Sequence, residues 1–147
     1  MVTVDGFDFP EDLFYLGGGT DQLWIKKENG KVRLGMTSLG SYAAGKIKFI
    51  RLRPPGKEVK AGRSVGTLES GKWTGAVKSP VTGTITETND GLKANPGLLN
   101  EDPYGKGWIA LIEASNWDED VGALQGADGL EAWAKTEVKE KKALKGE

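Results

Sequence analysis

The chain has 147 residues and a net charge of −1, and it contains neither cysteine nor histidine. The length fits one domain with its own core, while the charge and the lack of an apolar run of about 20 residues argue against nucleic-acid binding and membrane insertion. Without cysteine and histidine there is no thiolate nucleophile, Ser-His-Asp triad or Cys/His metal site, so redox or group-transfer chemistry would need an attached group.

The first twenty residues predict an irregular N-terminal arm. Pro10-Glu11-Asp12 predicts a short helical turn, because proline and acidic residues favour the first turn of a helix. Gly17-Gly18-Gly19 predicts a chain break after it. We expect four aromatic residues to attach this arm to the domain surface: Phe7, Phe9, Phe14 and Tyr15.

The predicted core covers residues 21–115, and its first half combines strands with one helix. A strand begins at Leu23, and Asn29-Gly30 is typical of a two-residue hairpin turn. Thr37 and Gly45 predict the N-cap and the end of a short helix between them. The next strand covers residues 46–52, and its alternation predicts one face made of Ile47, Phe49 and Arg51.

The second half of the core predicts further strands, and the tail at 116–147 predicts a helix. Short helical pieces are expected near Leu92 and Leu98. The tail helix covers residues 128–144, with an apolar side of Leu130, Trp133, Val138 and Leu144. Its lysine-rich end is either a solvated face or a basic docking site. The later strands are expected at residues 57–60, 65–70, 73–78, 84–88 and 108–113. This pattern predicts a mostly β fold of seven or eight strands in two small antiparallel sheets, with a C-terminal helix.

Two extended runs flank Gly71-Lys72, which predicts a tight hairpin turn. A two-residue turn with glycine first is typical of type II′, with Gly71 at positive φ and Lys72 at the apex. A lysine in this place presents its amine to a modifying enzyme and anchors a mobile arm. The alternative is an ordinary surface lysine.

The surroundings of Lys72 resemble the modified hairpin of biotinyl/lipoyl carrier domains. In those domains Glu-Ser or Glu-Thr precedes the lysine, and Ser-Pro with a glycine follows it. Here Glu69-Ser70 precedes Lys72, and Ser79-Pro80 with Gly83 follows. Biotin carriers usually place methionine on both sides of the lysine, whereas the neighbours here are Gly71 and Trp73, so the resemblance favours a lipoyl group.

A second motif resembles the signature of the glycine-cleavage H protein family, and the resemblance covers residues 22–115. It begins with Asn89, Leu92 and Pro96 and ends with Asn100-x-Asp102-Pro103-Tyr104-Gly105-x-Gly107-Trp108. The resemblance implies a flattened β-barrel-sandwich fold with a C-terminal helix. From the residues themselves we expect Tyr104 and Trp108 to pack near the Lys72 hairpin and Asp102 to cap a turn.

The same resemblance implies a non-enzymatic carrier with lipoate attached covalently to Lys72. Glu69, Ser70, Gly71 and Trp73 would then form the hairpin that a lipoate ligase or lipoyl transferase recognises. We expect a cytoplasmic protein, because no signal peptide is evident at the N-terminus. We also expect a monomer.

Departures from the family pattern concern the partners. Lys46 and Arg51 stand where H proteins usually have acidic residues, and Trp73 stands where they usually have alanine. The Glu-Ser-Gly-Lys-Trp hairpin with the following Gly75 resembles the lipoate-binding proteins of heterodisulfide-reductase-like sulfur oxidation, so we favour transfer of sulfur intermediates among the enzymes of that system. The alternatives are an H protein that carries the aminomethyl group of glycine cleavage, an unmodified interaction module, and an enzyme that uses Glu101 and Asp102.

Overall fold

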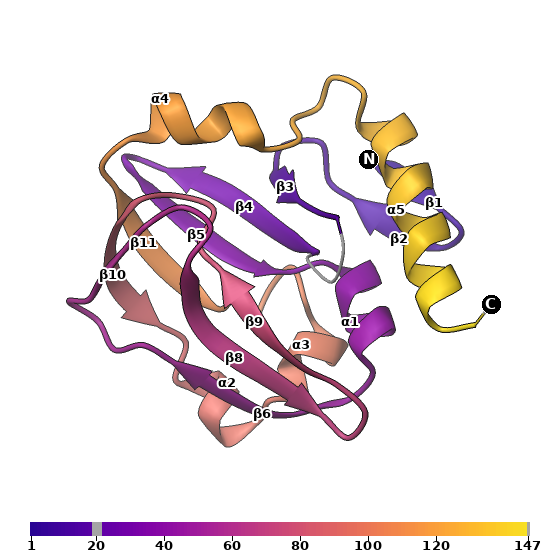
Figure 1. Ribbon diagram of the computed structural model, residues 1–147, viewed down its shortest axis with the longest axis horizontal. Helices are drawn as coiled ribbons and strands as arrows, with labels where there is room; N and C mark the ends of the chain where they lie inside the picture. Colours follow the sequence, from indigo (N-terminus) through magenta and orange to yellow (C-terminus); the bar gives the residue numbers. More distant parts are fainter. Residues whose placement is uncertain (19–21, 147) are drawn as a thin grey trace.

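The computed structural model describes residues 1–18 and 22–146 of the chain (Figure 1). Gly19 of the predicted chain break and Asp21 at the start of the predicted core lie outside these residues. The strands are β1 (Val2–Val4), β2 (Phe7–Phe9), β3 (Phe14–Leu16), β4 (Leu23–Glu28), β5 (Lys31–Met36), β6 (Ile47–Leu52), β7 (Glu58–Val59), β8 (Ser64–Ser70), β9 (Thr74–Lys78), β10 (Gly83–Thr88) and β11 (Ala110–Ala114). The helices are α1 (Ser38–Ala44), α2 (Gly91–Ala94), α3 (Leu98–Glu101), α4 (Trp117–Asp120), the 3₁₀ turn η1 (Val121–Ala123) and α5 (Leu130–Leu144).

Most of the described strands form two antiparallel sheets around one core. The larger sheet has the order β3-β4-β5-β11-β10-β7, and the smaller has the order β6-β8-β9. Ile25 and Leu34 of the larger sheet and Leu68 and Val77 of the smaller sheet are fully buried in the same apolar cluster. The mostly β fold with a C-terminal helix is therefore confirmed, and β1 and β2 add a separate two-stranded sheet.

Local sequence signals account for the hairpin and the helix that precede β6. Asn29 and Gly30 have φ values of 49° and 80°, as a type I′ turn between β4 and β5 requires. The side chain of Thr37 accepts a hydrogen bond from the Gly40 N–H at 3.0 Å, and Gly45 ends α1 with φ of 81°. Both predictions are confirmed.

The irregular N-terminal arm was a wrong prediction. Asp5-Gly6 forms a tight turn with φ values of 51° and 85°, and it joins β1 to β2. An Asp-Gly pair between alternating apolar residues is a strong hairpin signal, which the interpretation of an irregular arm overlooked. Residues 11–12 form a turn and no helix, whereas Phe9 and Tyr15 are buried as expected.

A bulge in β6 overturns the predicted face of Ile47, Phe49 and Arg51. Ile47 pairs with Ser70, but Phe49 already pairs with Glu69, so Lys48 is one extra residue in β6. The extra residue reverses the alternation. Ile47 is buried, whereas Phe49 lies on the solvent side with 63% of its surface exposed.

Helix α5 packs on the outside of the larger sheet, against a second apolar cluster. Leu130 and Val138 are buried there with Phe9 and Trp24. Leu144 was wrongly assigned to the apolar side, because 66% of its surface is exposed. Figure 1 shows α5 beside α1, with the β8–β9 turn on the other side of α1. Within the described residues, no helix has the length and apolar character needed to span a membrane.

Candidate functional site

The turn between β8 and β9 has the predicted two-residue length but not the predicted backbone type. Glu69 pairs with Thr74, and the Ser70 N–H donates to the Trp73 carbonyl at 2.8 Å, which leaves Gly71 and Lys72 at the tip. Gly71 does not have positive φ, so the type II′ prediction is wrong. Instead, the Lys72 N–H donates to Ser70 Oγ at 3.3 Å, and this side-chain contact supports a turn with ordinary φ values.

The side chains of the hairpin divide between solvent and core. Lys72 and Glu69 are exposed, while Ser70 is buried beneath the turn. Trp73 is half-buried, and its indole lies directly over Gly75. A Cβ on Gly75 would lie 2.1 Å from Trp73 Cζ2, so the indole can occupy this position only because residue 75 is glycine.

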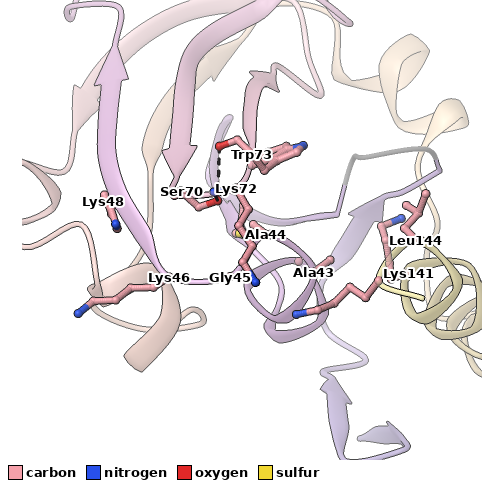
Figure 2. A pocket seen from close by; sticks show the side chains of 14 residues that line it. Ala43, Ala44, Gly45, Lys46, Lys48, Ser70, Lys72, Trp73, Lys141 and Leu144 are labelled. Carbon is pink, nitrogen blue, oxygen red and sulfur yellow. Dashed lines mark hydrogen bonds between the residues drawn. The ribbon is translucent and has the colours of Figure 1, made fainter. Parts of the chain in front are cut away.

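A groove of about 650 Å³ opens beside Lys72. Figure 2 shows Lys72 between Lys46 and Lys48 on one side and Lys141 and Leu144 of α5 on the other. The floor is apolar, and three segments distant in the sequence supply the walls: the stretch from the end of β5 through α1 to the start of β6, the hairpin tip, and the end of α5. The lining residues are Met36, Gly40, Ala43, Ala44, Gly45, Lys46, Lys48, Ser70, Gly71, Lys72, Trp73, Lys141, Leu144 and Lys145.

Asn100, from the second motif, fixes the wall where α1 meets β6. Its Nδ2 donates to the Gly45 carbonyl at 2.8 Å, and its Oδ1 accepts from the Ile47 N–H at 2.9 Å. One amide side chain thus satisfies both sides of the connection that carries Lys46. Nearby, the Ser41 hydroxyl donates to the Leu99 carbonyl, which ties α1 to α3.

A buried ion pair fixes the wall contributed by α5. Lys141 Nζ lies 3.5 Å from Glu137 Oε1, and both side chains are almost fully buried. The same oxygen accepts hydrogen bonds from the Gly18 N–H at 2.8 Å and from Gln22 Nε2 at 2.9 Å. The prediction of a solvated lysine-rich end is therefore wrong for Lys141, because this network anchors α5 to the preceding chain.

The groove is strongly basic. Among the described residues no carboxylate lines it, and none forms an ion pair with Lys46, Lys48, Lys72 or Lys145. Lys145 is held in place, since its Nζ donates to the Tyr42 carbonyl at 2.8 Å and lies 4.3 Å from the centre of the Tyr42 ring. The described residues contain no cluster of acidic side chains suited to a metal ion.

The groove fits a lipoyl-lysine arm attached at Lys72. Its volume is within the roughly 300–1,000 Å³ that small-molecule sites usually have. Met36 and Ala44 offer apolar surface to an aliphatic chain, and the exposed Lys72 amine is accessible for amide formation.

Of the residues proposed from the sequence, Ser70, Gly71, Lys72 and Trp73 line the groove, but Glu69 does not. The sequence singled out Lys46, and it indicated Lys141 and Lys145 only as members of the lysine-rich tail, with no link to the hairpin. Lys48 was missed. The alternation Lys46-Ile47-Lys48 after the end of α1 could have indicated that Lys46 and Lys48 point to the same side. No spacing in the sequence connects α5 to the hairpin.

Tyr104 and Trp108 were wrongly expected near the Lys72 hairpin. The Trp24 indole N–H donates to the Pro103 carbonyl at 2.8 Å, and its ring lies 6.3 Å from that of Tyr104. Arg33 stacks over Trp108 at 4.5 Å. The expected cap is confirmed, since Asp102 Oδ2 accepts from the Lys106 N–H at 2.8 Å.

Comparisons with known proteins agree over nearly the whole chain. The model of the family described as "Glycine cleavage H-protein" matches residues 17–137. Glycine cleavage system H protein 5 of Aquifex aeolicus is 42% identical over 130 residues, covering 87% of this chain and 88% of that protein. A probable glycine cleavage system H protein 2 of Sulfolobus acidocaldarius is 41% identical over 132 residues, 89% of each chain. The crystal structure of a glycine cleavage system H protein from Mycobacterium marinum has a TM-score of 0.76 and 31% identity, covering 86% of this chain and 99% of that one.

Proposed function

The chain belongs to the glycine cleavage H-protein family, and on that premise we propose that Lys72 is the residue that carries its lipoyl group. Members of this family are lipoyl carriers and not catalysts, and their cofactor is lipoate bound covalently to a lysine. The observation that supports Lys72 is its place: an exposed lysine at a hairpin tip that opens directly onto a groove with an apolar floor.

When attached, lipoate would supply a disulfide: an incoming nucleophile bonds to one sulfur while the S–S bond breaks and the other sulfur leaves as a thiolate. The chain itself holds the root of the arm. The ladder of β8 and β9 and the Ser70–Lys72 contact fix the backbone at the tip, so that the arm moves while its attachment point does not. Tethering keeps the arm at high effective concentration near any enzyme to which the carrier is bound.

We propose that the ligase or transferase reads the tip through Glu69, Ser70, Gly71 and Trp73. Glu69 is exposed on the outer face of β8, and Trp73 stands beside the lysine. Ser70 and Gly71 act through the shape of the turn, since Ser70 is buried and Gly71 has no side chain.

The first candidate for the clients is the glycine cleavage system, with an aminomethyl group as the carried group. The names of the similar proteins support it, because the relatives in Aquifex aeolicus and Sulfolobus acidocaldarius and the Mycobacterium marinum structure are all described as H proteins of that system.

The second candidate is transfer of sulfur intermediates in a heterodisulfide-reductase-like system. Its support is the basic groove, together with the Trp73–Gly75 pair that reshapes the surface beside the arm. The Aquifex aeolicus relatives are numbered 2 and 5, so that organism has several chains of this kind, and these need not share one client.

Intact mass spectrometry tests the attachment site. Incubation of the full chain with lipoate, ATP and a lipoate ligase is expected to add the mass of one lipoyl group. Lys72→Arg should abolish the increase, while Lys60→Arg, an exposed lysine outside the groove, should leave it unchanged. An unchanged mass of the parent chain with an active ligase would contradict the proposal and favour an unmodified interaction module.

A second assay separates the two clients. The lipoylated chain is mixed with glycine decarboxylase, and exchange of labelled carbon dioxide into glycine is measured. Exchange above that of the Lys72→Arg variant supports the glycine cleavage role. No exchange, with an authentic H protein active in parallel, counts against that role.

A further inference from the structure

We infer that the groove beside Lys72 is a binding site for an anionic group carried by the arm, with Lys46, Lys48 and Lys145 as its cationic residues. The inference rests on the proposed attachment of lipoate to Lys72. It goes further by naming the charge class of the carried group.

The charge balance of the groove is positive even after attachment. An amide bond to lipoate removes the charge of Lys72. Lys141 is balanced by Glu137, its partner at 3.5 Å. Lys46, Lys48 and Lys145 remain, and no described carboxylate pairs with them or lines the groove. A concave site lined by charges of one sign concentrates the field inside it.

The placement of these lysines directs that field at the arm. Lys48 is the extra residue of the β6 bulge, and its Nζ lies 3.2 Å from the point where a Cβ of Gly71 would stand. The absence of a side chain at residue 71 therefore leaves room for an ammonium group at the root of the arm. On the opposite wall, the Tyr42 carbonyl and ring hold Lys145.

The apolar floor of the groove and its lysine side chains suit different parts of a loaded arm. Met36, Ala43 and Ala44 present apolar surface that can pack against the aliphatic chain. The carried group then shares the groove with the ammonium groups of Lys46, Lys48 and Lys145. A protonated amine would be repelled there, whereas a carboxylate, sulfonate or thiosulfonate would be stabilised by direct ion pairs. Lys145 lies beyond residues 17–137, so the match to the family model does not include this feature.

A series of arms that differ in charge tests the inference. The lipoylated full chain is reduced with a phosphine, which becomes the phosphine oxide, and both thiols are alkylated. Iodoacetate gives anionic carboxymethyl arms, iodoacetamide neutral carbamidomethyl arms, and bromoethylamine cationic aminoethyl arms. Each alkylation forms one S–C bond, expels one halide and releases one proton. The readout is the methyl resonance of Met36, one of two methionines in the chain, with the disulfide form of the arm as reference.

The carboxymethyl arm is expected to shift the Met36 resonance about threefold more than the aminoethyl arm, with the carbamidomethyl arm between them. About 1 M NaCl should remove most of the difference, because it shortens the Debye length to about 3 Å. Lys46→Gln combined with Lys48→Gln should also remove it. The matched control is Lys57→Gln combined with Lys60→Gln, which neutralises two exposed lysines outside the groove.

Equal shifts from the anionic and cationic arms, a larger shift from the cationic arm, or no shift from any arm would overturn the inference. So would a charge preference that survives in the Lys46→Gln/Lys48→Gln chain. Failure of the proposed attachment is seen separately as a missing lipoyl mass, and it would remove the basis of the inference before any alkylation.

Discussion

Gly75→Ala is expected to destabilise the chain by forcing the Trp73 indole off the sheet. The new Cβ would lie 2.1 Å from Cζ2 and 2.6 Å from Cη2 of the indole, so the ring must move by more than about 1 Å to restore ordinary contact. A half-buried indole hides on the order of 100 Å², and its release costs about 2–3 kcal/mol. Alanine recovers roughly 0.5–1 kcal/mol of the conformational cost of glycine in a strand. The net loss is about 1–2.5 kcal/mol.

Urea unfolding followed by far-ultraviolet circular dichroism measures this loss, with the free energy of unfolding obtained by linear extrapolation. In the Trp73→Ala chain the same substitution meets no indole, so it should be neutral or slightly stabilising. The coupling energy in the double-mutant cycle is then about 2 kcal/mol. Gly122→Ala is the control, because a Cβ there meets nothing within 4 Å. Equal costs of Gly75→Ala in both backgrounds would refute the reasoning.

Three further predictions concern the contacts of Asn100, Lys141 and Tyr104. Asn100→Ala leaves the Gly45 carbonyl and the Ile47 N–H without their partner. It should lower the free energy of unfolding, measured by urea titration, by about 2–4 kcal/mol. A loss below about 0.5 kcal/mol would contradict the role of these two hydrogen bonds. Lys141→Met should lower the free energy of unfolding by about 3–5 kcal/mol, because Glu137 keeps a buried charge without its partner. Adding Glu137→Gln should restore part of this loss. No recovery in the double variant would contradict the ion pair. Burial raises the pKa of Tyr104 to about 12, from about 10 in the unfolded chain. Its stabilising contribution is complete below about pH 10 and is lost as the pH rises to about 12. The free energy of unfolding of the Tyr104→Phe chain should therefore depend less on pH over that range. An identical pH dependence in both chains would contradict the raised pKa of Tyr104.

The sequence alone determined the features that depend on a few consecutive residues. Asn29-Gly30 specified its turn because few other pairs tolerate two positive φ values. Thr37 and Gly45 defined α1 through backbone groups within one helical turn of each end. The position of Lys72 at a hairpin tip was predictable for the same reason, although Ser70 stabilises the turn in a way that the glycine pattern did not indicate.

Only the tertiary structure decided what surrounds Lys72. The groove takes its walls from residues 36–48, 70–73 and 141–145, and no periodicity within one segment records the approach of another. One extra residue in β6 moved Phe49 from the predicted inner face to solvent and Lys48 toward the turn, because alternation along a strand reverses at a bulge. Lys141 looked like a solvated residue of a lysine-rich helix end, and burial beside Glu137 makes it part of the anchor for α5. The sequence thus identified the residue that we propose to carry the arm, and the packing of distant segments created the basic groove beside it.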